Sequence, residues 1–263
     1  MGASLRALFM SAPVALEFLT PLRLRRVDRW DDVTFASALG WYPAVGLLIG
    51  LALLGIDVAT AELLPVGVRS ALLVAALAVL SGGLHLDGVA DTADGMALQG
   101  ERNERLGVMS VGNVGPAGVM ALVIVLIVQW SALTALAEPL RAGALVLAPA
   151  MARWTVAPVA VLFASARPRG LGATLQQGVW PFAAPLSAII AFAAGYVLFG
   201  PEGLVLPVAA AVAAIILAGA ASRMIGGVTG DTYGGAIEIA QAATLIVILA
   251  AASQGWLEPT FLE

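Results

Sequence analysis

The sequence predicts an all-α protein, a polytopic bundle of about seven transmembrane helices with a polar site facing the cytoplasm. Sixty per cent of the 263 residues are hydrophobic and 11% are charged, whereas soluble domains have about 25% charged residues. Several uncharged stretches reach the ~20 residues that a helix needs to cross a bilayer. The arginines gather in loops that would share one side of that bilayer. A soluble fold is excluded, because it would need a polar exterior that this composition cannot supply.

We expect one integral membrane domain over residues 1–263, beginning with an interfacial segment over 1–30. In that segment apolar residues recur at roughly helical spacing, and an arginine-rich turn follows them. The seven expected spans cover 33–56, 66–84, 116–136, 142–164, 179–199, 203–222 and 233–256.

Each span follows from its charge pattern. Residues 33–56 carry no charge, and 116–136 belongs to a longer uncharged run. The span at 66–84 includes Arg69, whose long side chain can snorkel to the interface. The span at 142–164 holds Arg153 near its middle, and an intramembrane arginine needs a polar cavity or a partner. Residues 179–199 and 203–222 are apolar runs, and the last span, 233–256, follows an acidic motif.

The arginine positions also predict the orientation. With the N-terminus in the cytoplasm, Arg69 and Arg141 lie outside and ten other arginines lie inside or near that face, as the positive-inside rule expects. The chain contains neither cysteine nor lysine, which excludes thiolate and Schiff-base chemistry and a Walker-type phosphate loop. A net charge of −4 gives no reason to expect a nucleic-acid partner.

The densest polar motif is GGLHLDGVADTADG at residues 82–95. Asp87, Asp91 and Asp94 have the spacing i, i+4, i+7, which places them within about 60° of one helix face. Three neighbouring carboxylates repel one another unless a cation lies between them. Oxygen ligands without cysteine favour Mg²⁺, with Mn²⁺ as a substitute. His85 points away from this face, and we expect it to form hydrogen bonds or to contact substrate.

Other polar residues are predicted to collect on the same side. The glycine-rich turn around Asn113 leads into a helix, whose free N–H groups can bind an anion. Arg153 is a candidate phosphate ligand or a partner for Glu238, which lies about two turns into the last span. Asp231 shares a helical face with Glu238. Carboxylates that hold a metal, together with arginines, are typical of phosphoryl transfer.

Motif 82–95 resembles the signature of the adenosylcobinamide-GDP ribazoletransferases, also called cobalamin synthases. Four further stretches are similar to segments of that family and extend the resemblance over most of the chain. They are residues 17–20, 42–46, 105–118 and 230–238.

The resemblance implies an enzyme of the bacterial inner membrane that requires Mg²⁺. Its substrates would be adenosylcobinamide-GDP and α-ribazole or α-ribazole phosphate, and it would release GMP and form adenosylcobalamin or its phosphate. Asp87, Asp91 and Asp94 would hold the metal, and Asp94 or Asp231 would accept the proton of the attacking hydroxyl. The candidate substrate contacts are His85, Arg102, Arg105, Asn113, Arg153, Asp231 and Glu238. Membrane lipid is the other expected partner, and the formation of a homo-oligomer stays open.

The sequence departs from the family at Asn113, where many members carry an aspartate nearby. An inactive relative is therefore one alternative. A second is a CDP-alcohol phosphotransferase of phospholipid synthesis. Against it, that family's motif has Ala-Arg after its Asp-Gly pair, whereas here Ala90 is followed by Asp91. A membrane transporter is the third, although no repeat or pair of discontinuous helices supports it.

Overall fold

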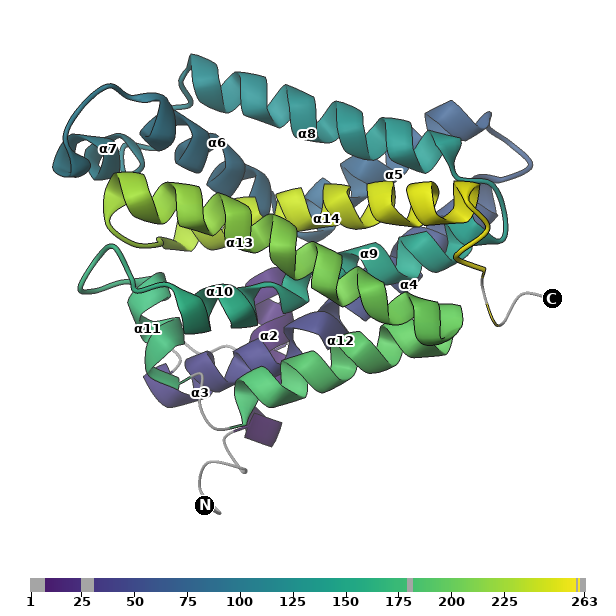
Figure 1. The fold of residues 1–263 in the computed structure, drawn as a ribbon, viewed down its shortest axis with the longest axis horizontal. Coiled ribbons are helices and arrows are strands. Elements are labelled where there is room, and N and C mark those ends of the chain that lie inside the picture. Colours follow the sequence, from purple (N-terminus) through teal and green to yellow (C-terminus); the bar gives the residue numbers. More distant parts are fainter. Residues whose placement is uncertain (1–7, 25–30, 179–181, 259, 261–263) are drawn as a thin grey trace.

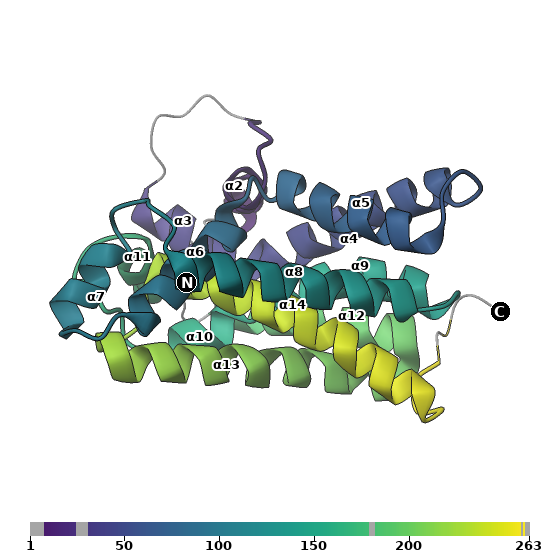
Figure 2. The ribbon, with the colours of Figure 1, turned by 90° about the horizontal axis from the view of Figure 1, so that it is seen from above.

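The computed structural model describes residues 8–24, 31–178, 182–258 and 260, and helices dominate throughout them. Most of the helices lie side by side along one direction, with α14 through the middle of the bundle (Figures 1 and 2). The elements are α2 (Ala12–Leu19), α3 (Asp32–Ser37), η1 (Ala38–Trp41), α4 (Tyr42–Thr60), α5 (Val66–Leu80), α6 (Leu84–Ala97), α7 (Arg102–Val108), α8 (Pro116–Ala135), α9 (Leu140–Trp154), α10 (Val156–Leu162), α11 (Leu171–Gly178), α12 (Ala183–Phe199), η2 (Gly200–Leu204), α13 (Val205–Ile225) and α14 (Gly230–Ser253).

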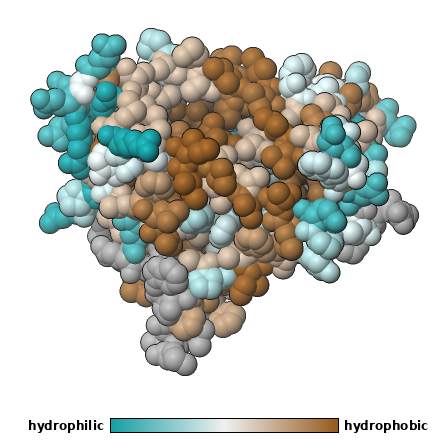
Figure 3. All heavy atoms as spheres, viewed as in Figure 1, coloured by the Kyte–Doolittle hydropathy of each residue, from teal (hydrophilic) through white to brown (hydrophobic). Residues whose placement is uncertain are grey.

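The outer surface of the bundle is suited to lipid. A broad band of hydrophobic side chains separates two polar ends (Figure 3). Large apolar side chains such as Met120, Ile189 and Ile216 are 60–67% exposed. In water this much exposed apolar surface would be unfavourable, whereas in a bilayer it is solvated by the lipid chains. The expectation of an all-helical integral membrane bundle is therefore confirmed.

The described residues hold five helical segments that are long and apolar enough to cross a membrane, or six if α5 and α6 form one broken span. The expected number of seven is not confirmed. Two expected spans, 179–199 and 203–222, correspond to one apolar helical segment, Ala183–Ile225, in which η2 separates α12 from α13. Residues 179–181 of the first span lie outside the described residues. The expected span 66–84 corresponds to α5, which has only 15 residues. Much of the N-terminal segment 1–30, including Arg6, Arg25, Arg26 and Arg29, lies outside the described residues.

Small residues let the central helices approach closely. A Cβ atom added to Gly46 of α4 would lie 2.5 Å from the backbone of Pro149 and Ala150 in α9. One added to Gly50 would lie 2.4 Å from the carbonyl oxygen of Val146. Such backbone contact is how helices gain packing energy in lipid, where no hydrophobic effect drives them together. Helix α4 is thereby fixed against the central layer of the bundle.

A sharp bend separates α5 from α6. Gly82 and Gly83 adopt left-handed φ angles of 61° and 72°, which residues with a Cβ rarely adopt. The two helix axes differ in direction by 89°. The bend therefore places the acidic motif on a helix of its own at one end of the bundle.

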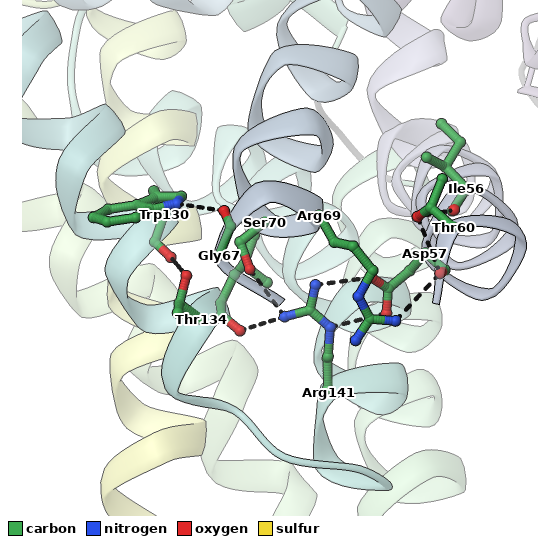
Figure 4. A network of polar contacts seen from close by, with 10 residues as sticks. Ile56, Asp57, Thr60, Gly67, Arg69, Ser70, Trp130, Thr134 and Arg141 are labelled. Carbon is green, nitrogen blue, oxygen red and sulfur yellow. Dashed lines mark hydrogen bonds and ion pairs between the residues drawn. The ribbon is translucent and has the colours of Figure 1, made fainter. Parts of the chain in front are cut away.

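At the opposite end, a buried ion pair joins α4 to α9 (Figure 4). Arg141 donates from Nε and from Nη2 to the two carboxylate oxygens of Asp57, each over 2.8 Å. It also donates to Ser70 of α5 over 3.1 Å and to the carbonyl oxygen of Leu133 in α8. Arg69 lies 3.6 Å from the same carboxylate. Arg141, which the sequence places in an outer loop, is therefore a buried core residue, 1% exposed, that connects four helices.

We predict that Asp57→Leu or Arg141→Met alone lowers the unfolding temperature of the detergent-solubilised protein markedly. Removing one partner of a buried ion pair leaves an uncompensated charge, at a cost of about 3–5 kcal/mol. The double variant Asp57→Leu/Arg141→Met should unfold at a higher temperature than either single variant, and thermal unfolding followed by circular dichroism checks this. Glu62→Gln, at an exposed position near the same end, is the control. Losses that simply add in the double variant would contradict the coupling.

Candidate active site

Helix α6 carries four of the predicted site residues. His85, Asp87, Asp91 and Asp94 all lie on this helix, and the three aspartates follow one another at intervals of about one turn, as the sequence predicts. Asp87 is exposed, whereas Asp91 and Asp94 are 7% and 8% exposed. The motif therefore presents one carboxylate to the surface and directs two towards neighbouring helices.

A backbone contact between α6 and α14 brings the fourth aspartate to this group. A Cβ on Gly88 would lie 2.6 Å from the carbonyl oxygen of Asp231 and 2.9 Å from the Cα of Gly234. Glycine is therefore required at the crossing. As a result, Asp91 lies within the electrostatic reach of Asp87, Asp231 and Asp94. The predicted meeting of residues from motif 82–95 and from the start of the last span is thus present in the structure.

Asp231 occupies the first turn of α14. The helix begins with a capping box in which the side chain of Thr229 accepts a hydrogen bond from the backbone N–H of Thr232. The hydroxyl of Thr229 also lies 3.2 Å from Asp231 Oδ2 and donates to it. Asp231 is half-buried. Its carboxylate is therefore held in place and still accessible.

Asp94 has a different environment. Its two carboxylate oxygens accept hydrogen bonds from the backbone N–H groups of Gly115, over 2.6 Å, and Gly118, over 2.8 Å. These groups belong to the N-terminus of α8, where positive partial charge favours an anion. The glycine-rich turn therefore does bind an anion, and in this structure the anion is Asp94. Asn113 lies exposed in the loop before α8.

The two arginines of α7 bind backbone carbonyl groups. Arg102 donates to Ile225 over 2.8 Å and to Ala166 over 2.6 Å. Arg105 donates to the end of α6, with the closest contact 2.7 Å to the carbonyl oxygen of Met96. Both arginines hold loops around the acidic group, and their predicted contact with phosphate stays a prediction.

A third arginine, Arg167, lies in the loop before α11. It donates to Ser110 over 2.8 Å and to the carbonyl oxygen of Leu106 over 3.1 Å. Its charge acts on both Asp91 and Asp231. Two arginines in one predicted cytoplasmic loop, Arg167 and Arg169, are also the sequence signal for a phosphate clamp.

Arg153, Glu238 and His85 form a buried polar group inside the bundle. Glu238 accepts a hydrogen bond from Gln129 of α8 over 2.7 Å, and its other oxygen lies 4.0 Å from His85 Nδ1. Arg153 is 1% exposed and interacts electrostatically with Glu238, and within the described part of the chain it donates to the carbonyl oxygen of Pro149 in its own helix. Gln129 is thus the hydrogen-bond partner that the buried Glu238 needs. Sequence reasoning missed Gln129, although it is a polar residue inside an apolar span.

A cavity of about 150 Å³ opens beside Asp87 and Asp231. Residues of α2, α4, α6, α10, α11 and α14 line it, and most of the lining is apolar. His85 and Tyr42 are also part of the lining. Pockets that hold whole drug-sized ligands usually measure about 300–1,000 Å³, so this cavity suits one part of a larger molecule.

The oxygen donors of this group have the chemistry that magnesium prefers. Within the described ranges, however, no three histidine, aspartate or glutamate side chains are grouped closely enough to hold a metal ion. Both oxygens of Asp94 already accept backbone hydrogen bonds. The donor set therefore fits an ion that takes one or two protein carboxylates and completes its shell with water and substrate oxygens.

Comparison with known proteins gives a consistent result. The family model described as "Cobalamin-5-phosphate synthase" matches residues 11–249. A protein of Pseudomonas paraeruginosa named "Adenosylcobinamide-GDP ribazoletransferase" is 36% identical over 93% of this chain and 99% of its own length. Proteins with the same name from Geotalea daltonii and Brevibacillus brevis are 32% and 30% identical, over 90% and 95% of this chain and 96% and 98% of their own lengths. No solved structure matches the chain.

The family model covers most of the chain, including motif 82–95, the Asp94–α8 contact and the acidic start of α14. The relatives align over nearly their whole length. The chain therefore belongs to the cobalamin-5-phosphate synthase family.

Proposed function

We propose that this protein transfers the adenosylcobinamide-phosphate moiety of adenosylcobinamide-GDP to α-ribazole or α-ribazole 5′-phosphate. GMP is released, and adenosylcobalamin or its 5′-phosphate forms in a late step of cobalamin biosynthesis. The relatives that carry this transferase name support the proposal. The observation that carries it is the meeting of Asp87 and Asp91 with Asp231 beside a cavity. Family membership does not favour a CDP-alcohol phosphotransferase or a transporter.

Asp231 is the residue that we propose as general base. The reaction needs a new bond between a ribose oxygen and the phosphorus atom attached to the cobinamide, and it breaks the bond from that phosphorus to the GMP oxygen. The proton of the attacking hydroxyl moves to a carboxylate. Asp231 lines the cavity and is held by Thr229. Asp94, the other candidate, has both oxygens engaged by backbone groups.

Magnesium is the cofactor that we propose, with Mn²⁺ as a substitute. Asp87 and Asp91 would hold it, and Asp94 is a third predicted ligand whose oxygens also bind α8. When bound, the ion neutralises negative charge on the diphosphate oxygens. A site of one or two carboxylates agrees with the absence of a three-residue cage among the described residues.

The remaining predicted residues would act around the phosphates. Arg167 would stabilise the diphosphate, because its charge already acts on Asp91 and Asp231. Arg102 and Arg105 would add positive charge while they hold the loops, and the amide of Asn113 would contact substrate from the α8 loop. Glu238 would act from the interior through its proximity to His85, and Arg153 would offset the charge of Glu238.

The proposed topology has seven spans in the bacterial inner membrane, with the N-terminus and the active site on the cytoplasmic side. Arg102, Arg105 and Arg167 lie at the acidic end of the bundle through their contacts there. At the other end, Arg141 is paired with Asp57. The excess of arginine at the acidic end supports a cytoplasmic active site.

The function is tested with purified protein in nanodiscs. Adenosylcobinamide-GDP, α-ribazole phosphate and Mg²⁺ should yield GMP and cobalamin phosphate, detected by mass spectrometry. EDTA should abolish the product, and added Mg²⁺ should restore it. If neither product forms although both substrates bind, the chain is an inactive relative. If neither substrate binds, the proposed function is wrong, and incorporation of a CDP-linked lipid is the next assay.

We predict that Asp91→Asn reduces turnover by about 10²–10³-fold at every Mg²⁺ concentration, as is typical when one group that stabilises developing charge is removed. Initial rates measured across a Mg²⁺ titration check this. Glu138→Gln, at an exposed position before α9, should leave the rates unchanged. Full activity of Asp91→Asn at saturating Mg²⁺ would show that the proposed metal site is wrong.

Asp231→Asn should lower kcat by about 10²–10⁴-fold, the usual contribution of a general base. The KM values for both substrates should change little, because asparagine preserves the shape and the hydrogen bond from Thr229. Steady-state kinetics in nanodiscs separate the two effects. A variant that loses substrate binding and keeps its kcat would contradict the role as a base.

A further inference from the structure

The cavity beside Asp87 and Asp231 has a composition that phosphate binding does not explain. Its walls are mainly apolar and include Phe18, Leu84, Val156, Leu175 and Ile237. No arginine is among the lining residues found in the described part of the chain. A diphosphate placed there would lose its hydration without gaining a cation. The cavity is therefore suited to an uncharged part of a substrate.

Tyr42 and His85 also line the cavity. Their polar atoms, the Tyr42 hydroxyl and both ring nitrogens of His85, are buried and have no hydrogen-bond partner among the described residues. Because these atoms have almost no accessible surface, the two residues contribute ring carbon atoms to the cavity wall. Both side chains therefore add to its apolar character.

The tyrosine is also held in a fixed position. The ring of Phe18 stacks on that of Tyr42, with centroids 6.1 Å apart and planes inclined by 22°. Tyr42 belongs to the first turn of α4, which Gly46 and Gly50 fix against α9. A rigid aromatic wall suits a planar ligand, because little entropy is lost on binding.

We propose that this cavity binds the heterocyclic base of the ribazole substrate, with the base lying against the aromatic wall that Phe18 and Tyr42 form. This inference rests on the proposed function. The base of α-ribazole is a dimethylbenzimidazole, which is flat, uncharged and apolar apart from one nitrogen acceptor. Guanine would place several donors and acceptors against an apolar wall, at a cost for each unpaired group. The corrin ring is too large for a cavity of about 150 Å³.

The placement also fits the direction of the reaction. With the base among the apolar side chains, the attached ribose leaves the cavity where Asp87 and Asp231 line it. The attacking hydroxyl then lies beside the carboxylate that we propose as its base. The cavity would thus orient the nucleophile towards the diphosphate, a contribution that lowers the entropic part of the barrier.

The test compares KM values for the two substrates. Tyr42→Leu should raise the KM for α-ribazole by about 2- to 10-fold, the effect of losing one aromatic contact, and leave the KM for adenosylcobinamide-GDP unchanged. Tyr42→Phe, which keeps the ring, should leave both KM values unchanged. A KM for α-ribazole that Tyr42→Leu does not change would overturn the contact with the aromatic wall.

Filling the cavity provides a second measurement. Leu175→Trp should raise the KM for α-ribazole at least tenfold, whereas Leu63→Trp, at a position 77% exposed between α4 and α5, should not change it. Free dimethylbenzimidazole should compete with α-ribazole and not with adenosylcobinamide-GDP.

The outcomes separate this inference from the proposed function. An active enzyme in which Leu175→Trp leaves the KM for α-ribazole unchanged overturns the inference and keeps the function. Wild-type protein without transferase activity that still binds dimethylbenzimidazole, and loses this binding in Leu175→Trp, keeps the cavity as a base site and overturns the function. A lipid acyl chain recovered from the cavity and not displaced by dimethylbenzimidazole overturns the inference.

Discussion

The close crossing of α6 and α14 is the contact on which the site depends. Gly88 meets the backbone of Asp231 and Gly234 at distances that leave no room for a side chain. Because the contact is between backbones, the acidic residues of both helices are brought to one face with little freedom to move apart. Asp91 consequently lies within the electrostatic reach of three other carboxylates. Their repulsion costs free energy, and a cation or a cation–phosphate pair bound beside them would offset this cost.

Two further polar groups keep the crossing in place from inside the bundle. Glu238 is bound by Gln129 and lies near Arg153, so α14 is connected to α8 and α9 just below the site. The Asp57–Arg141 pair connects α4, α5, α8 and α9 at the other end (Figure 4). In a bilayer, an unpaired charge of this kind would be expensive, so these pairs strongly disfavour arrangements that separate the helices. The polar pairs therefore hold the helices, which touch through small residues, in one relative position.

Much of this architecture could be predicted from the sequence, because lipid imposes a strong constraint on composition. Uncharged runs identify membrane helices, and the i, i+4, i+7 spacing of the aspartates places them on one helix. Pairings between distant residues could not be predicted in the same way. Arg141 resembles a loop arginine in the sequence, and only the fold shows that Asp57 lies opposite it. The positions of Arg102 and Arg105 on carbonyl groups likewise depend on loops that meet only in three dimensions.

The contacts of Asp94 bear on the substitution at Asn113. In this chain the N-terminus of α8 is anchored by Asp94, through the N–H groups of Gly115 and Gly118. The anchor uses backbone groups and therefore does not depend on the side chain at position 113, which is exposed. Asp87, Asp91 and Asp231 are brought together by a separate contact, the glycine crossing. An amide at Asn113 thus leaves both the anchor and the carboxylate group intact, which argues for an active enzyme over an inactive relative.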